Sequence, residues 1–310
     1  MNRIIVTGAS GFVGRATVAA LADRGYEVHG VARTPVDDIR AHAWHTANLL
    51  DPAEVSAVVR TAEASHLLHL AWTTAHGRYW SDPANLAWAR ATCSLAEAFI
   101  EAGGVRAVMS GSCAQYSWDS EAIGPSGIAN ETSTPRRPAT LYGWAKQATA
   151  ELLEAWSAQV GLSYATALVF FPYGPFEQPE RLLPSVARSL LAGEAAEVSV
   201  GTQVRDFMHV EDCGAAIAAL VDGGVTGAVN IGTGQGSSVA DVARLIARLL
   251  EREDLLRLGA RSATDEAPKI VADPTRLHNG VGVTPKYDLE SGIRETIDWW
   301  SAHATKIAPG

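Results

Sequence analysis

The sequence predicts an α/β fold built on a doubly wound parallel sheet, with a smaller α/β lobe from the C-terminal third of the chain. Short apolar, strand-like runs alternate with amphipathic helical stretches through the first half of the 310 residues, a pattern typical of a parallel sheet covered by helices on both faces. A glycine-rich turn separates the first strand from the first helix. Hydrophobic residues make up 47% of the chain, enough to bury a sizeable core.

The chain opens with a strand, a tight turn and a helix. Residues 3–6 form the predicted strand, 7–14 the turn, and 15–24 an amphipathic helix that Gly25 ends. A second strand, 27–32, completes a βαβ unit of the length that binds dinucleotides. Glycine shapes such a turn and lets the backbone approach a pyrophosphate, while the helix N-terminus offers free N–H groups to the anion. The turn therefore predicts a dinucleotide site.

The remaining pattern predicts the domain organisation. We expect a Rossmann domain of residues 1–170 plus about 205–232, and a smaller substrate lobe of about 171–204 plus 233–310, placed over the carboxyl ends of the strands. The long polar loop 118–138 is expected to be functional, for example as a lid or substrate loop, because structureless loops of this length are uncommon in compact domains. The alternative is plain surface irregularity. The other expected helices are 52–62, 83–102, 140–159, 179–192, 210–221, 238–250 and 289–302, and the other strands are 66–71, 105–110, 162–171, 198–200, 204–209 and 229–232.

Composition limits the partners and the compartment. The formal net charge of -9 and the lack of a long basic run argue against nucleic acid and anionic membranes as partners. No apolar stretch is long enough to span a bilayer, and the first residues do not resemble a secretory signal, so we expect a cytoplasmic protein. Three dispersed cysteines fit reduced thiols, and nine histidines without metal-ligand spacing predict no metal site.

Tyr142 and Lys146 stand four residues apart on a predicted helix and so share one of its faces. Chance supplies such pairs on many solvated helices. Here the glycine-rich turn precedes them, and Ser110-Gly111-Ser112 ends an upstream apolar run, which favours a chemical role. For Ser112 alone, the alternative is a serine that satisfies backbone groups at a strand end.

Several motifs in order resemble the extended short-chain dehydrogenase/reductase family, which contains nucleotide-sugar epimerases, dehydratases and 4-ketoreductases. The resemblance covers nearly the whole chain and implies an NAD(P)-dependent Rossmann enzyme that acts on a nucleotide sugar. It also implies a homodimer through the helices 83–102 and 140–159. The motifs are residues 7–14, His69-Leu70-Ala71, 110–116, Tyr142 with Lys146, 172–175 and 205–212.

The resemblance also assigns roles. Tyr142 carries the proton, Lys146 favours the phenolate and grips the nicotinamide ribose, and Ser112 holds the substrate oxygen. Arg205 contacts the nucleotide diphosphate, as suits a guanidinium, with Arg261 as a second candidate. The alternative for Arg205 is a surface ion pair with Asp206 or Glu211. The implied cofactor contacts are Gly8, Gly11, Phe12, Val13, Gly14, Asn48, Leu49, Leu70, Ala71, Tyr142, Lys146 and Pro172.

The end of the second strand bears on the choice of cofactor. NAD enzymes of this build usually have an acidic residue there, whereas an arginine can meet the 2′-phosphate of NADP. The strand ends Val31-Ala32-Arg33-Thr34, so we predict NADP with Arg33 as the phosphate contact. In the alternative, Arg33 is solvated and Asp37 or Asp38 folds back to the ribose, and the cofactor is NAD.

Departures from the family pattern bear on the reaction. Dehydratases of the family carry Asp-Glu directly after the position of Ser112, and Cys113-Ala114 cannot replace that acid and base. Trp88 and Phe171 stand where asparagines are common in UDP-galactose-type epimerases. We predict NADPH-dependent reduction of an NDP-4-keto-6-deoxyhexose, as in deoxysugar biosynthesis. The alternatives are an NAD-dependent nucleotide-sugar 4-epimerase and, in another class, a catalytically silent NAD(P)-binding sensor or scaffold.

Overall fold

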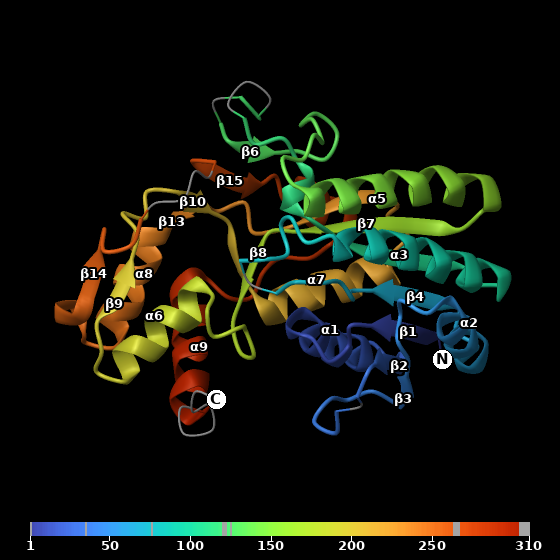
Figure 1. Cartoon of the computed structure of the whole chain (residues 1–310), viewed down its shortest axis with the longest axis horizontal. Coiled ribbons are helices and arrows are strands. Elements are labelled where there is room, and N and C mark those ends of the chain that lie inside the picture. Colours follow the sequence, from blue (N-terminus) through green and yellow to red (C-terminus); the bar gives the residue numbers. More distant parts are fainter. Residues whose placement is uncertain are drawn as a thin grey trace.

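A parallel sheet of seven strands forms the centre of the molecule (Figure 1). The computed structural model describes residues 2–34, 36–75, 77–119, 123–124, 126–262 and 267–303. The strand order is β12-β7-β5-β4-β1-β2-β3, and each neighbouring pair is parallel. The predicted α/β fold is therefore confirmed. The strands are β1 (Arg3–Thr7), β2 (Glu27–Ala32), β3 (Ala43–Thr46), β4 (His66–His69), β5 (Arg106–Ser112), β7 (Ser163–Val169) and β12 (Gly227–Ile231).

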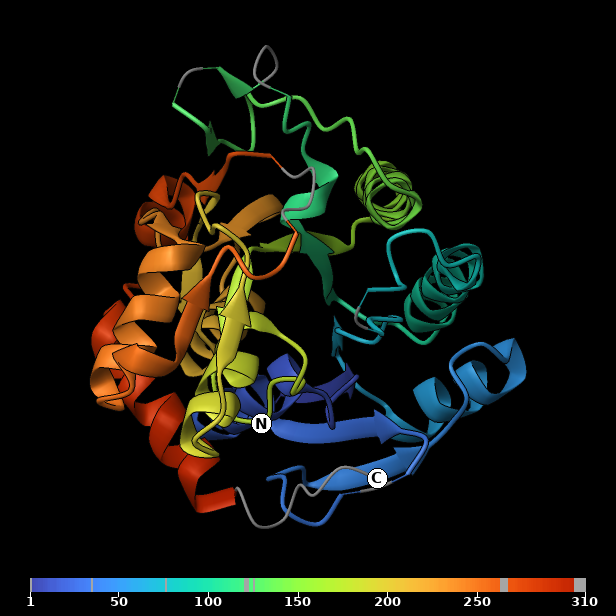
Figure 2. The ribbon, with the colours of Figure 1, turned by 60° about the vertical axis from the view of Figure 1, so that its left-hand side comes forward.

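Helices cover both faces of this sheet. Successive strand residues point to opposite faces, so Ile4 and Val6 join a core with α1 and α7, while Ile5 joins the core of α2, α3 and α5. Figure 2 shows α3 and α5 side by side on one face, with α1 on the other. The helices are α1 (Phe12–Asp23), α2 (Pro52–Ala62), α3 (Ala84–Glu101), α5 (Leu141–Val160) and α7 (Val210–Asp222).

A separate hydrophobic cluster lies beside the large sheet, on the left of Figure 1. Its helices are α6 (Leu182–Leu191), α8 (Val239–Leu249) and α9 (Leu289–His303), packed with β9 (Ala196–Val198) and β14 (Leu256–Leu258). Short strands join the two regions: β8 (Phe171–Tyr173) pairs with β11 (Phe207–His209), and β6 (Ile128–Ala129), β15 (Lys269–Ala272), β10 (Val204–Arg205) and β13 (Ser237–Ser238) form a small sheet. The proposed domain boundaries stay a prediction.

Some predicted elements differ from the observed ones for identifiable reasons. α1 begins at Phe12 because Gly11 is its N-cap, so the turn leads straight into the helix. The predicted strand 162–171 is divided, since β8 leaves the large sheet and pairs with β11. Strand β3 was not predicted, because it is a half-exposed edge strand without an apolar run.

Candidate functional site

The carboxyl ends of the parallel strands bring the predicted site residues to one edge of the sheet. Strand β1 pairs with both β2 and β4, and β4 pairs with β5. Gly8, Arg33 and Leu70 directly follow β1, β2 and β4, and Ser112 ends β5. Ligands of open parallel sheets bind at this edge.

The glycine-rich turn is shaped as a cradle for an anion. Gly8 has φ +70°, and a Cβ there would lie 2.7 Å from the backbone nitrogen of Ala71. A Cβ on Gly14 would collide with the Gly8 carbonyl oxygen. Gly11 is the N-cap of α1 and provides no side-chain cap, so the first-turn N–H groups remain available to a ligand. These features fit the pyrophosphate of a dinucleotide.

The loop after β2 places charged side chains near this turn. Arg33 is exposed, and the Asp38 carboxylate accepts a 2.7 Å hydrogen bond from Arg15, the residue after Gly14. The Arg15 guanidinium also lies 4.4 Å from the centre of the Phe176 ring. Asp38 is thus engaged by Arg15 in this structure.

Asn48 and Leu49 follow β3. Asn48 is exposed, and its side-chain oxygen accepts a 3.2 Å hydrogen bond from the Leu50 backbone. Leu49 is half-buried against the core beneath α2 and α3. Their assignment to the cofactor stays a prediction.

Ser112 is held by a capping box at the end of β5. Its hydroxyl accepts a 3.2 Å hydrogen bond from the Ala114 backbone, and its own N–H donates to the Gln115 side chain at 2.9 Å. Gln115 in turn donates to Gln147 of α5 at 2.8 Å. Because Gln147 follows Lys146 in the helix, this buried link fixes Ser112 relative to the face that carries Tyr142 and Lys146.

Tyr142 lies in the first turn of α5, and its side chain meets Ser112. The helix starts there because the Thr140 hydroxyl caps it by accepting from the Gly143 backbone at 3.1 Å. Burial raises the pKa of Tyr142 to about 12, although a hydrogen bond with the Ser112 side chain opposes the increase. The phenol therefore keeps its proton at neutral pH, beside a serine hydroxyl.

Lys146 is buried one turn further along α5. Its ammonium donates to the Ser110 carbonyl oxygen at 2.7 Å and to the Ser110 hydroxyl at 3.1 Å, and it lies 4.1 Å from the centre of the Trp72 ring. Burial lowers its pKa to about 7. The pKa of Tyr142 is raised by its burial in this structure, and the lowering of the phenol pKa that the family resemblance implies for Lys146 stays a prediction.

The two arginines predicted for the substrate occupy different settings. Arg205 is only 3% exposed, donates to the carbonyl oxygens of Val204 and Ala267, and lies close enough to Cys113 to lower the pKa of that thiol. Arg205 is therefore not a surface residue, and its role stays a prediction. Arg261 is exposed, and its backbone donates to Val198 in β9. Pro172 lies in β8, opposite Met208.

Two side chains near Tyr142 were not predicted from the sequence. Tyr79 is 6% exposed, and its ring meets that of Tyr142 edge to face with 4.9 Å between centres. Arg181, the N-cap of α6, interacts with both tyrosines and forms a hydrogen bond with Tyr79. Both follow strands that end at the ligand-binding edge, and that position was the signal available in the sequence.

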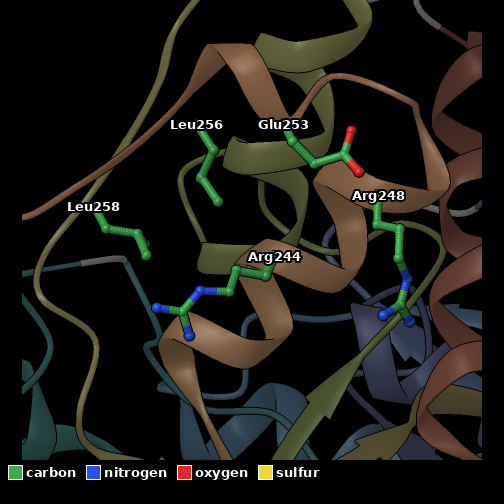
Figure 3. A pocket seen from close by; sticks show the side chains of 5 residues that line it. All are labelled: Arg244, Arg248, Glu253, Leu256 and Leu258. Carbon is green, nitrogen blue, oxygen red and sulfur yellow. The ribbon is translucent and has the colours of Figure 1, made fainter.

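A hollow of about 450 Å³ lies elsewhere, on the surface of the C-terminal region (Figure 3). Arg244 and Arg248 of α8 line it, and each is paired with a carboxylate, Asp241 and Glu290 respectively. Glu253, Leu256 and Leu258 complete its lining. It contains none of the predicted site residues.

In the described part of the chain, no cluster of three or more His, Cys, Asp or Glu side chains has an arrangement that holds a metal ion. Of the helices that the structure describes, none combines the length and the apolar character needed to cross a membrane.

Comparison with known proteins gives one family and consistent structural neighbours. Residues 4–232 match the model of the NAD dependent epimerase/dehydratase family. The chain is 25% identical to the dTDP-glucose 4,6-dehydratase of Shigella flexneri over 98% of this chain and 94% of that protein. It resembles the structure of MoeE5 in complex with UDP-glucuronic acid and NAD (28% identity, TM-score 0.82, 96% and 98% of the two chains covered). The fold of Thermotoga maritima UDP-glucose 4-epimerase matches with TM-score 0.86 at 22% identity, over 97% and 99% of the two chains.

Proposed function

The chain belongs to the NAD dependent epimerase/dehydratase family, and on that premise we propose that it transfers a hydride between a nicotinamide dinucleotide and a nucleotide-activated hexose. The specific reaction we propose is NADPH-dependent reduction of an NDP-4-keto-6-deoxyhexose. The observation that carries the proposal is the contact of a protonated Tyr142 with Ser112 at the sheet edge that also bears the glycine cradle.

Each residue then has a distinct task. A bound nicotinamide supplies the hydride. Ser112 donates a hydrogen bond to the carbonyl oxygen of the sugar and stabilises the charge that develops there. Tyr142 gives its proton to the same oxygen, and burial ensures that the proton is present at neutral pH. The Lys146 ammonium, on the same helix face, stabilises the phenolate that remains.

The residues after Ser112 argue against dehydration, although several relatives are dTDP-glucose 4,6-dehydratases. Elimination of water requires an additional acid and base. Burial raises the pKa of the Cys113 thiol to about 12, and Ala114 has no titratable group. Neither residue suits that role.

The test is to incubate the protein with NDP-4-keto-6-deoxyhexoses and NADPH. We expect NADPH to be consumed in step with the sugar. Turnover of an NDP-hexose to its 4-keto-6-deoxy product would refute the argument against dehydration. Absence of turnover with every NDP-4-ketohexose would refute the reductase proposal.

A 4-epimerase that keeps NAD bound is the second candidate, and one observation favours NAD as its cofactor. MoeE5, at 28% identity, was solved with UDP-glucuronic acid and NAD. An epimerase returns the hydride to the opposite face of the sugar and so uses no net cofactor. Interconversion of UDP- or TDP-hexoses without net loss of reduced cofactor would establish this function in place of the reductase.

Cofactor preference depends on Arg33. If its exposed guanidinium meets the 2′-phosphate of NADP, Arg33→Ala is expected to weaken NADPH binding about tenfold, the value of one charge-assisted contact, while NADH binding changes little. Titration followed by fluorescence measures both. Arg40→Ala is the matched control, because Arg40 lies in the same loop and pairs with Asp23. Clearly tighter binding of NADH than NADPH by the wild type would refute the NADP assignment.

We further propose that Arg205 neutralises the diphosphate of the nucleotide sugar and that Arg261 assists it. Support for Arg205 comes from its proximity to Cys113, the neighbour of Ser112. For Arg261 the support is its exposure beside β9, where a guanidinium is accessible to an anion.

Dimerisation through α3 and α5 is a further part of the proposal. Leu86, Trp144 and Leu152 are large apolar side chains on these helices that are 54%, 52% and 59% exposed, and Trp144 and Leu152 share a face. A charge at the core of such an interface is costly. Leu152→Glu is therefore expected to give a monomer in analytical ultracentrifugation, whereas Val200→Glu, at an equally exposed position between β9 and β10, leaves the dimer intact. A wild-type protein that is monomeric in the same experiment would refute the proposed dimer.

A further inference from the structure

The segment between β4 and α3 touches both Tyr142 and Lys146. At one end, the Trp72 indole lies under the Lys146 ammonium, 4.1 Å from it. At the other end, the Trp80 carbonyl oxygen accepts a 3.1 Å hydrogen bond from the Tyr142 backbone, and the Tyr79 ring meets the Tyr142 ring edge to face. One stretch of chain thus bears on the two side chains to which the proposed function gives proton chemistry.

Asn85, in the first turn of α3, connects the two ends of that segment. Its side-chain oxygen accepts a 2.8 Å hydrogen bond from the Trp72 indole N–H. Its amide nitrogen donates to the carbonyl oxygens of Tyr79 at 2.7 Å and Asp82 at 2.8 Å. The residue is 0% exposed. A buried amide whose oxygen and both N–H groups are used holds its partners in a fixed arrangement.

We propose that Trp72 and Asn85 are positioning residues of the hydride-transfer site. The face of the Trp72 indole holds the Lys146 ammonium in place and in its charged form. Asn85 fixes that indole relative to the turn that packs on Tyr142. The inference rests on the proposed function only for the roles of Tyr142 and Lys146, since the contacts themselves are independent of the substrate.

The surroundings of Lys146 make the indole important. The titratable groups that face it are His69 of β4, whose pKa burial lowers to about 3, and Tyr164 of β7, whose pKa burial raises. Both are neutral at neutral pH, as is Tyr142 on the same helix. The ammonium is therefore stabilised by the Ser110 oxygens and by the indole, because a desolvated cation is attracted to an aromatic face. The small hollow behind the ammonium is also lined by Thr92, Met109, Thr149, Ala150 and Thr166.

The consequence for titration has a definite sign. An interaction that favours the charged form raises the pKa of a lysine, so its removal lowers the pKa. In Trp72→Leu, the pH above which Lys146 loses its charge is expected to fall by about one unit, which is the value of a desolvated cation–π contact. Trp72→Phe keeps an aromatic ring without the hydrogen bond to Asn85, and Asn85→Leu keeps the indole without its anchor. Both substitutions are expected to lower the pH at which Lys146 loses its charge by a few tenths of a unit.

The measurement is the affinity for NADPH, followed by fluorescence from pH 5.5 to 9.5, together with the pH profile of turnover. The Lys146 limb is the part of each pH profile that changes as Lys146 loses its charge, and it is identified by its absence in Lys146→Met. We expect a shift to lower pH in the Trp72 and Asn85 variants and none in Trp44→Phe, a tryptophan of β3 distant from α5. Circular dichroism and thermal melting establish that each variant is folded.

Two outcomes separate this inference from the proposed function. A Lys146 limb at the wild-type pH in folded Trp72→Phe and Asn85→Leu would overturn the positioning role, even if turnover decreased, since a purely structural defect does not move the limb. If no NDP-4-ketohexose is reduced but the limb still shifts in cofactor binding, the reductase proposal fails and the positioning role holds.

Discussion

Turnover of Tyr142→Phe is expected to be lower than that of the wild type by about 10²- to 10⁴-fold, the usual contribution of a positioned general acid. The substitution removes only the hydroxyl. The ring can remain in place because it packs edge to face against Tyr79 and Trp80, with centres 4.9 and 5.8 Å apart. The loss is measured as the rate of NADPH consumption with the best 4-keto sugar found in the screen.

Measurements of cofactor binding and of a control variant distinguish loss of the proton donor from a general defect of the protein. NADPH binding by Tyr142→Phe is expected to stay within about threefold of the wild type, since one neutral hydrogen bond contributes about 1 kcal/mol or less. Tyr26→Phe is the control, because Tyr26 directly precedes β2, at the opposite end of this strand from the ligand-binding edge, and its hydroxyl donates to Asp222. Undiminished turnover in Tyr142→Phe would contradict the mechanism. A wild type that binds NADPH without turning over any nucleotide sugar would favour the silent sensor or scaffold.

Substitution of Gly14 by alanine is expected to reduce dinucleotide affinity by on the order of 100-fold. The new Cβ would collide with the Gly8 carbonyl oxygen and lie 2.9 Å from that of Ala9. Both are backbone atoms, so the turn itself has to move, at a cost of roughly 3 kcal/mol, the upper end of ordinary overpacking. That cost corresponds to about two orders of magnitude in affinity. Titration with NADPH and NADH measures the loss.

Gly224→Ala is the matched control, because a Cβ at Gly224 would meet no atom within 4 Å. Both variants are compared by thermal melting as well, since a distorted turn also strains the packing of α1 against β1. If Gly14→Ala binds both dinucleotides as tightly as the wild type does, the turn between β1 and α1 is not the cofactor cradle.

Local sequence patterns were sufficient for most of the large sheet. Strand β2 and helix α2 have the predicted bounds, and α5 differs from prediction by one residue at each end. These elements contain strong local signals: an apolar run for β2, and N-cap side chains for the helices, Asp51 before α2 and Thr140 before α5. Strands β14 and β15 were missed because each has only three or four residues and is stabilised by a partner far away in sequence.

The chemistry of the site was less accessible from sequence than its location. Spacing placed Tyr142 and Lys146 on one helix face, and Ser112 at a strand end beside them. It did not reveal that Lys146 contacts Ser110 and Trp72, nor that burial sets the pKa values of Lys146 and Tyr142 at about 7 and about 12. A pKa depends on solvent exclusion and on neighbours from several strands and helices, and no local pattern encodes either.

The sequence by itself determined the α/β class, the glycine turn, and the order of the motifs along the chain, because backbone conformation and hydrophobic periodicity are local properties. Only the tertiary structure decided which side chains surround the proposed proton donor. Tyr79 and Arg181 interact with Tyr142, and Trp72 contacts Lys146. Asn85 of α3 binds Trp72 and Tyr79. Parallel strands make this possible, since they bring the ends of distant segments to one edge of the sheet, where contacts depend on packing rather than on sequence separation.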